Sequence, residues 1–390
     1  MTVKELSKKY ESYMIDMRRE FHMNPELSLK ETRTSRRIRE ELEATGIPVT
    51  PFESGNVVGI IKGGKGGDKR VAIRADIDAL PMQEELDVPY KSTVPNVMHS
   101  CGHDAHTAIL LGIAKTLWEV RDSLSGTVYL CFQIAEEIGQ GAAELVDYLK
   151  AQGGVDMVIG THISAMIESG WIDLQDGPRM AGAVGFSIDV QGKGGHGSRP
   201  DLCINPIFPA CEIVQKIAAI PANRHRPFDT CVVSPCMLNV GQKNNIIAET
   251  AHIEGSARFY AYGDDDRLIE KIRHIATNAA EGWGGSATVT SSAMAAYPVI
   301  NEPKASAFGR EIVKQIGATL CTDEPISAGS DNYSEFQAAF PGFYCRLGAL
   351  SKLPGSSPNH HNPKFDIDEA SFVVGAEFLA TTAYEFLNRG

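Results

Sequence analysis

Short apolar runs alternate with helical segments between residues 70 and 164, and this alternation constrains the fold more than any other feature. The stretches "RVAIRADIDALP", "GTVYLCFQIAEE" and "VDMVIGTHIS" are typical of buried strands. The stretches "AILLGIAKTLWEV" and "GAAELVDYLKAQG" between them are typical of helices. Strand–helix–strand order of this kind predicts an α/β fold with a largely parallel, doubly wound sheet.

The pattern changes near Gly182. Residues 183–297 predict a smaller α+β unit, in which several strands accompany the helical segment "DDDRLIEKIRHIATNAAEGWG". The tail resumes the first pattern, and "GFYCRLGAL" is expected to join the first sheet. A chain of 390 residues suits two domains. We therefore expect one domain built from residues 1–182 and 298–390, with residues 183–297 inserted into it.

Composition excludes several classes of partner. The net charge is −12 and no basic block occurs, which argues against nucleic acid and against an anionic membrane surface. The opening segment is charged throughout and predicts one amphipathic helix through Phe21, with no apolar signal core. No apolar stretch reaches membrane-spanning length, and the eight cysteines are scattered. We therefore expect a cytoplasmic protein without disulfides.

Ionisable residues stand at the ends of the expected strands. Asp76 and Asp78 follow the first, Glu136 and Glu137 follow the second, and His162 ends the third. In doubly wound sheets, ligands bind beyond the carboxyl ends of the strands. We therefore expect these side chains to converge in space although they are distant in sequence.

The stretch "MHSCGHDAHTA" places Cys101 and His103 at the mouth of a helix, on the same expected edge of the sheet. Cysteine, histidine and carboxylate together form a ligand set for zinc or a similar borderline ion. Tandem histidines, His360 and His361, follow the last expected strand, and one of them could complete the site. The two adjacent glutamates must diverge, so one can bind metal while the other acts as general base toward metal-activated water.

His196 lies in the inserted unit within "GKGGHGSRP". Glycines on both sides of it allow close backbone approach, so it could donate to a substrate carbonyl across an interdomain or intersubunit gap. The pattern assigns no role to four other histidines: His22, His106, His225 and His252.

The stretches "RADIDALP", "MHSCGHDAHTA", "AEE", "GTH", "GKGGHGSRP" and "HNPKFDIDE" occur in this order over nearly the whole chain. This set resembles the amidohydrolase branch of the dinuclear-metal aminoacylase and carboxypeptidase family. That branch includes hippurate hydrolases, N-acyl-amino-acid deacylases and the plant hydrolases of indole-acetyl-amino acids. The resemblance implies a metal-dependent hydrolase of the amide bond of N-acyl amino acids, or of related N-acyl or aryl amides.

The resemblance also implies two divalent cations per subunit, most readily Mn²⁺ or Zn²⁺, with Co²⁺ or Ni²⁺ as alternatives. Their implied ligands are Cys101, His103, Glu137, His162 and His361. His361 is chosen over His360 because the family's ligand stands two residues before the proline. Asp78 is implied to orient ligands rather than to bind metal.

Further roles follow from the same resemblance. Glu136 becomes the general base and acid, and His196 contacts the scissile carbonyl in the partner subunit's site. Asn245 and Arg258 are implied to hold a substrate carboxylate. The domain of residues 1–182 and 298–390 becomes catalytic, and residues 183–297 become a lid through which a homodimer forms, with a higher oligomer left open.

Four departures from the family pattern leave the substrate open. Ile134 replaces a proline, the run after His162 lacks one, "NIIA" replaces "NVIP", and Asp331-Asn332-Tyr333 replaces a Glu-Asp-Phe run. The alternatives are a dipeptidase or carboxypeptidase of the same family, and a metal-binding relative without turnover. A third is a thiol enzyme with Cys101 as nucleophile and His103 as base.

Overall fold

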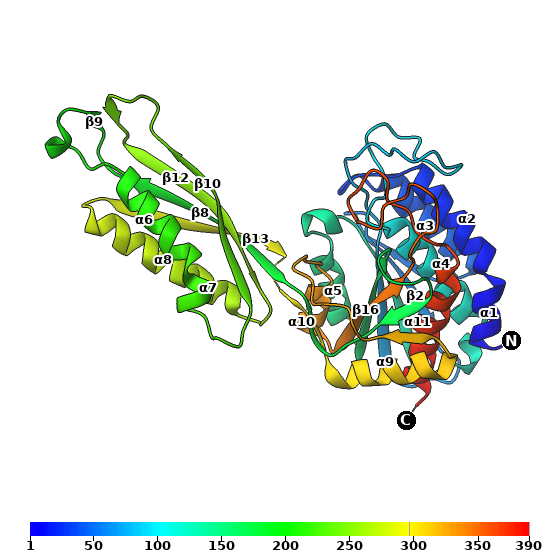
Figure 1. The fold of residues 1–390 in the computed structure, drawn as a ribbon. Coiled ribbons are helices and arrows are strands. Elements are labelled where there is room, and N and C mark those ends of the chain that lie inside the picture. Colours follow the sequence, from blue (N-terminus) through cyan, green and yellow to red (C-terminus); the bar gives the residue numbers. More distant parts are fainter. Residues whose placement is uncertain (296, 390) are drawn as a thin grey trace. The chain divides into compact units, whose positions relative to one another are not determined.

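The computed structural model describes residues 1–295 and 297–389, which form two compact units. Unit 1 consists of Met1–Arg179, Ile300–Pro325 and Glu335–Gly390, and unit 2 of Met180–Val299 and Ile326–Ser334 (Figure 1). Unit 2 thus includes a short segment that the chain reaches only after it has returned to unit 1.

Unit 1 is built on an eight-stranded sheet. Its order is β1 (Val49–Pro51), β2 (Val57–Lys62), β4 (Thr127–Gln133), β3 (Arg70–Asp76), β5 (Met157–Ser164), β16 (Gly342–Gly348), β6 (Trp171–Asp173) and β15 (Thr319–Cys321). The central strands β4, β3, β5 and β16 run parallel to one another. The α/β fold with a largely parallel sheet is therefore confirmed, and so is the expected place of β16.

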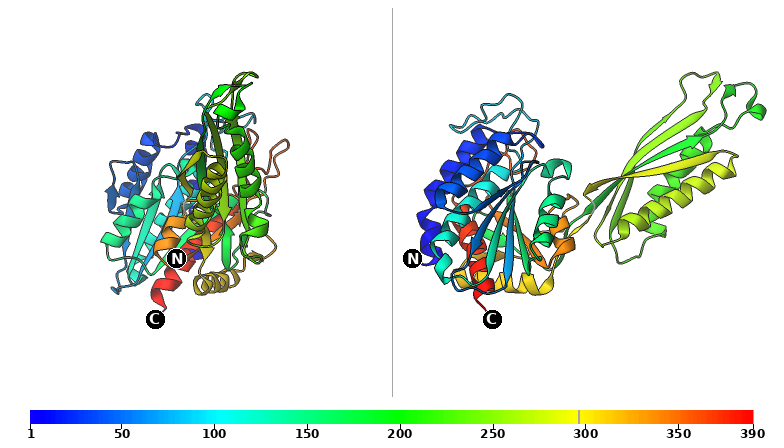
Figure 2. Two further views of the ribbon diagram at one scale, coloured as in Figure 1. Left: turned by 90° about the vertical axis from the view of Figure 1, so that its left-hand side faces the viewer. Right: turned by 180° about the vertical axis from the view of Figure 1, so that it is seen from behind.

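Helices cover both faces of this sheet (Figure 2). They are α1 (Val3–Lys9), α2 (Glu11–Met23), α3 (Thr32–Thr45), α4 (His103–Glu119), α5 (Ala142–Ala151), α9 (Pro303–Ile316), α10 (Ser334–Ala339) and α11 (Ser371–Asn388), with short turns η1 (Arg121–Ser123) and η2 (Glu136–Ile138). Helix α4 packs on β3 and β5 and is itself covered by α2 and α11. Its first turn is therefore buried from all sides.

The opening segment forms two helices, so the expectation of one continuous helix is wrong. The break falls at Tyr10, which has φ −92° and ψ 10° and caps α1 by donating its backbone N–H to the Leu6 carbonyl. The apolar spacing continues across the break because Leu6, Met14 and Phe21 are all buried. Periodicity reports the buried face, and it does not detect a one-residue interruption.

Unit 2 contains a four-stranded antiparallel sheet in the order β10 (Cys231–Val240), β12 (Thr250–Phe259), β8 (Gly182–Gln191) and β13 (Ser286–Ala295). Helices α6 (Ile207–Ala218) and α8 (Asp264–Gly282) pack against it and against each other. The smaller elements are η3 (Pro200–Leu202), α7 (Ile220–Asn223) and the pair β9 (Gly195–His196) and β11 (Ile246–Ile247). Strands β7 (Gly177–Met180) and β14 (Val299–Asn301) form a separate ladder.

None of the described helices combines the length and the apolar composition that a bilayer span needs.

Candidate metal centre

The candidate site begins where the chain enters α4. Gly102 adopts a left-handed conformation with φ +91°, and a Cβ atom there would lie 2.4 Å from Cγ2 of Ile163 on β5. Only glycine fits both conditions without strain. The carbonyl of Gly102 accepts the N–H groups of Ala105 and His106 and so starts the helix. The glycine thus lets the loop that carries Cys101 approach the end of β5 closely.

The five predicted ligands lie in one cluster of unit 1. Sγ of Cys101 is 3.4 Å from Nε2 of His162. Ligand atoms of Cys101, His103 and Glu137 all lie within 4.8 Å of one another. Nε2 of His361 is 3.4 Å from Oε2 of Glu137. Four chain segments therefore converge at the carboxyl edge of the sheet, as the strand order predicts.

Two atoms of this cluster test whether a cation fits it. Nε2 of His103 and Oε1 of Glu137 are buried, and neither has a hydrogen-bond partner among the described residues. They lie 3.9 Å apart. Buried polar atoms without partners are costly, and ligands about 2.0–2.2 Å from one ion can stand at nearly this spacing. The donor set therefore fits a divalent cation.

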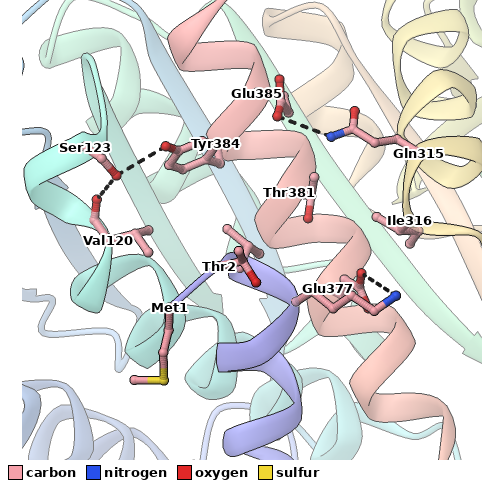
Figure 3. A pocket seen from close by; sticks show the side chains of 12 residues that line it. Met1, Thr2, Val120, Ser123, Gln315, Ile316, Glu377, Thr381, Tyr384 and Glu385 are labelled. Carbon is pink, nitrogen blue, oxygen red and sulfur yellow. Dashed lines mark hydrogen bonds and ion pairs between the residues drawn. The ribbon is translucent and has the colours of Figure 1, made fainter.

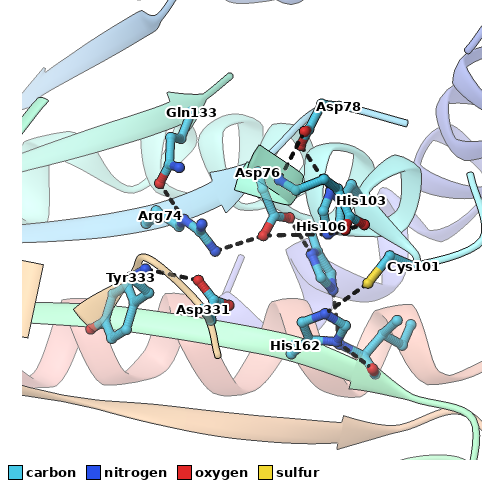
Figure 4. A network of polar contacts seen from close by, with 12 residues as sticks. Arg74, Asp76, Asp78, Cys101, His103, His106, Gln133, His162, Asp331 and Tyr333 are labelled. Atoms are coloured by element: carbon cyan, nitrogen blue, oxygen red, sulfur yellow. Dashed lines mark hydrogen bonds and ion pairs between the residues drawn. The ribbon is translucent and has the colours of Figure 1, made fainter. Parts of the chain in front are cut away.

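Asp78 joins two of the candidate ligands (Figure 4). Its Oδ1 lies 3.1 Å from Nδ1 of His103, and its Oδ2 accepts the backbone N–H of Glu137 at 3.1 Å. The hydroxyl of Ser28 donates to the same Oδ2 at 2.7 Å. Burial opposes the charge of Asp78, but the hydrogen bond from His103 lowers its pKa below the usual value. This is the geometry expected of a carboxylate that orients metal ligands.

The electrostatics of Cys101 and His162 suit ligands of a cation. Burial raises the pKa of the Cys101 thiol well above its usual value, so only a nearby positive charge would stabilise the thiolate. Burial also lowers the pKa of His162, which favours the neutral ring that metals bind. Nδ1 of His162 donates to the Ile163 carbonyl at 2.7 Å. Its Nε2 therefore carries the lone pair that faces Cys101.

The tandem histidines both reach the cluster. His361 is exposed, has φ +57° and contacts Glu137. His360 forms a second candidate ligand group with Cys101 and His162, and its Nδ1 is buried without a partner among the described residues. Burial lowers the pKa of His360 to about 4. The family resemblance favoured His361, whereas the structure also places His360 within 4.8 Å of ligand atoms of Cys101 and His162.

The two glutamates follow β4 in the turn η2. Ala135 precedes them with φ +57°, an uncommon conformation for a non-glycine residue, and donates its N–H to Glu31 Oε1 at 2.8 Å. Burial raises the pKa of this Glu31 to about 7. Glu136 is half-buried and adds negative charge around Cys101, which places it beside the cluster.

The three predicted site residues of unit 2 do not lie together. His196 pairs with Ile246 in the β9–β11 ladder, and the Gly197 N–H donates to the Asn245 carbonyl, so His196 and Asn245 are neighbours. Arg258 lies toward the other end of β12 from Thr250, roughly 27 Å away at about 3.4 Å per residue. It donates to Oγ of Ser330 at 2.8 Å.

Sequence reasoning missed a buried network behind the site. Oδ2 of Asp104 accepts from Nε of Arg18 at 2.9 Å and lies 2.7 Å from Nδ1 of His22. All three side chains are buried. Arg18 and His22 are four residues apart on α2, and a charged pair on the apolar face of a helix is a signal that could have found them.

Two of the sequence departures also have structural accounts. Ile134, where the family pattern has proline, donates its N–H to Oδ1 of Asn56 at 3.0 Å, a bond that proline cannot make. Asp331, Asn332 and Tyr333 are buried, and the Tyr333 N–H donates to Oδ1 of Asp331 at 2.8 Å.

A cavity of about 530 Å³ lies elsewhere in unit 1, beside the N-terminus (Figure 3). Residues of α1, α9 and α11 line it, and no predicted site residue is among its described lining residues. Its polar side chains pair with one another: Tyr384 donates to Ser123 at 3.2 Å, and Gln315 donates to Glu385 at 3.3 Å. The cavity therefore lacks the unpaired donor set of the cluster at the sheet edge.

A parallel sheet that gathers a thiol, imidazoles and carboxylates at its carboxyl edge is typical of a metal-binding site in an enzyme. The chain belongs to peptidase family M20/M25/M40, whose model matches residues 72–385. The predicted class, a hydrolase of amide or peptide bonds, is therefore confirmed, and so is the resemblance stated from the motifs.

Three similar proteins illustrate the range of the family. Thermostable carboxypeptidase 2 of Saccharolobus solfataricus is 38% identical over 98% of this chain and 97% of its own length. IAA-amino acid hydrolase ILR1-like 4 of Arabidopsis thaliana is 33% identical over 96% of this chain and 86% of its own. The crystal structure of YXEP from Bacillus subtilis, a dinuclear metal-binding peptidase, has a TM-score of 0.85 at 31% identity, covering 97% of this chain and 99% of its own.

Proposed function

We propose that this protein is a metal-dependent amidohydrolase that cleaves the amide bond of small N-acyl amino acids. The observation that carries the proposal is the pair of buried, unpartnered atoms, Nε2 of His103 and Oε1 of Glu137, inside the ligand cluster. Bound divalent cations would polarise the amide carbonyl and lower the pKa of water. Similarity to a dinuclear peptidase supports two cations, with Mn²⁺ or Zn²⁺ as first choices and Co²⁺ or Ni²⁺ as alternatives.

The side chains of unit 1 divide into holders and reactants. The holders are Cys101, His103, Glu137, His162 and His361. Asp78 fixes the orientation of His103 and the position of Glu137. Glu136 acts as general base: its carboxylate takes a proton from water and passes one to the leaving nitrogen.

His196 of unit 2 donates a hydrogen bond to the scissile carbonyl, and the substrate carboxylate is bound by Arg258 of one subunit and by Asn245, the neighbour of His196, of the other. The roughly 27 Å between Thr250 and Arg258 along β12 exceeds the length of a small substrate. The loop that carries His196 adjoins the Thr250 end, because the Gly192 N–H donates to the Glu249 carbonyl. This distance supports the idea that the residues at the two ends serve different active sites. We therefore propose a homodimer that forms through unit 2, the lid and dimerisation domain, with His196 acting in the partner's site.

A mixing experiment tests the dimer. Each of the variants His196→Ala and Glu136→Gln alone is expected to be nearly inactive. If His196 acts across a twofold interface, co-refolding equal amounts should restore about a quarter of wild-type activity, because half of the dimers then hold one complete site. Mixtures as inactive as the parents, with exchange verified by mass spectrometry, would place His196 in its own subunit's site.

A carboxypeptidase is the second candidate, and the 38% identity to thermostable carboxypeptidase 2 favours it. A panel of N-acyl amino acids, dipeptides and N-blocked peptides, assayed with Mn²⁺, Zn²⁺, Co²⁺ and Ni²⁺, separates the two. We expect the highest kcat/KM on N-acyl amino acids. Higher values on N-blocked peptides would establish the carboxypeptidase, and no turnover by fully loaded protein would leave a metal-binding relative.

A thiol enzyme is disfavoured. A nucleophilic cysteine needs a lowered pKa, whereas burial raises that of Cys101. Persistence of activity after complete metal removal would restore this alternative. The eight cysteines, all free thiols, support our further proposal of a cytoplasmic location, which cell fractionation would test.

A further inference from the structure

His106 lies one helical turn after His103 on α4, fully buried beside the ligand cluster. It forms a third group of potential ligands with Asp76 and His103. Proximity alone would therefore make it a candidate for a further cation site. The hydrogen bonds of His106, however, argue against a role as a metal ligand.

The backbone fixes the protonation of its ring. Nε2 of His106 is 2.8 Å from the amide nitrogen of Ile163, and a backbone N–H can only donate. Nε2 is therefore the acceptor, and the proton lies on Nδ1, which donates to Oδ1 of Asp76 at 2.5 Å. The one free lone pair of the neutral ring is thus occupied by Ile163, and His106 has none to offer a metal.

Asp76 is itself held in place. Nη1 of Arg74 donates to Oδ2 of Asp76 at 2.6 Å, and Nε of Arg74 donates to Oε1 of Gln133 at 2.9 Å. These side chains are buried, and they join the ends of β3 and β4. Through His106, the network reaches α4 and β5 as well (Figure 4).

The backbone N–H that donates to His106 belongs to Ile163, the residue after His162. The Ile163 carbonyl also accepts from Nδ1 of His162, so the same peptide segment sets the direction of the His162 ring. Nε2 of His162 then faces Sγ of Cys101 at 3.4 Å. A shift of the Ile163 backbone would therefore move a proposed metal ligand directly.

We propose that His106 is a positioning residue: by accepting from Ile163 while donating to Asp76, it holds the His162 end of β5 against α4. The cluster is thereby pre-formed before a cation arrives. This inference rests on the proposed function, because it assigns His162 to a metal. Loss of such an orienting contact typically lowers metal affinity by about 10- to 100-fold.

Two substitutions separate the two hydrogen bonds. In His106→Asn, the short amide can still donate to Asp76 but cannot reach the Ile163 N–H. In His106→Gln, the longer side chain can place its carbonyl oxygen where Nε2 stood and accept from Ile163. Each variant loses one buried hydrogen bond, so the two should lose similar amounts of Tm.

The readout is metal affinity of the full chain, measured by calorimetric titration of the metal-free protein with Zn²⁺. Co²⁺ absorption provides a second signal. We expect one of two metal equivalents to bind about 10- to 100-fold more weakly in His106→Asn and within about 3-fold of wild type in His106→Gln. Nitrogen-15 NMR of the wild-type protein should show His106 with its proton on Nδ1, before and after metal addition.

Three results would overturn this inference alone. The first is a wild-type metal affinity in His106→Asn. The second is an equal loss of metal affinity in both variants that parallels their loss of Tm. A metal-induced coordination shift of the His106 ring would make it a ligand instead, and this NMR result does not depend on any variant folding. Wild-type protein that binds no cation would overturn the proposed function together with this inference, whereas the other results leave the proposed function intact.

Discussion

The predicted site residues lie close together in unit 1, whereas in unit 2 they do not all lie together. In unit 1, residues between Cys101 and His361 meet within a few ångströms. In unit 2, His196 lies in the two-stranded β9–β11 sheet, whereas Arg258 lies on β12 of the four-stranded sheet, eight residues along the strand from Thr250. Parallel strands end at the same edge, so residues that follow them converge, whereas antiparallel strands distribute them to both edges. Motif order therefore predicts the contacts in unit 1 better than those in unit 2, where His196 and Asn245 are neighbours and Arg258 is not.

The largest expected effect concerns Glu136. We expect Glu136→Gln to lower kcat by about 10²- to 10⁴-fold, because the general base is lost, while metal content stays at the wild-type level. Steady-state kinetics and metal analysis on the same preparation check both. Loss of metal would contradict the prediction and would indicate that Glu136 is a metal ligand.

The next effect tests whether unit 2 contributes to the rate of the reaction and not to metal binding. We expect His196→Ala to lower kcat by about 10²- to 10³-fold, as for other carbonyl-oxygen donors, with metal binding unchanged. Cys101→Ala is the contrasting variant, because it should lose metal as well as rate. If both variants lost metal, the proposal that only unit 1 binds metal would be wrong.

The tandem histidines sharpen the picture of unit 1. We expect His361→Ala to weaken binding of one metal equivalent by about 10- to 100-fold, and His360→Ala to weaken it less. Zinc titration of the two variants measures the difference. The reverse order would assign the ligand to His360, which already neighbours Cys101 and His162.

The last comparison concerns stability and not activity or metal affinity. Gly102→Ala should lower the free energy of unfolding by about 2–4 kcal/mol, because the new Cβ meets Ile163 at 2.4 Å and φ is +91°. Gly317→Ala is the matched control: its φ is +77°, but nothing lies within 4 Å of the new atom, so only about 1 kcal/mol should be lost. Urea denaturation measures both. Equal losses would show that the approach of α4 to β5 is not tight.

The sequence predicted the sheet and the convergence of the ligands because both follow from local apolar patterns and one rule of topology. It did not predict that Ile326–Ser334 packs with unit 2, because no composition change marks that segment. It gave no role to His106, since one amide of β5 defines that role and no motif encodes it. Likewise, Asn56, which accepts the N–H of Ile134, is 78 residues away in sequence.

The cluster draws on both halves of the chain. Cys101, His103, Glu137 and His162 precede unit 2, whereas His360 and His361 follow it. During synthesis, a nascent chain cannot assemble the full set until His360 and His361 have left the ribosome. Unit 2 therefore emerges before the set of proposed ligands is complete, so a cation bound by the full set would be captured only after unit 2 has been synthesised.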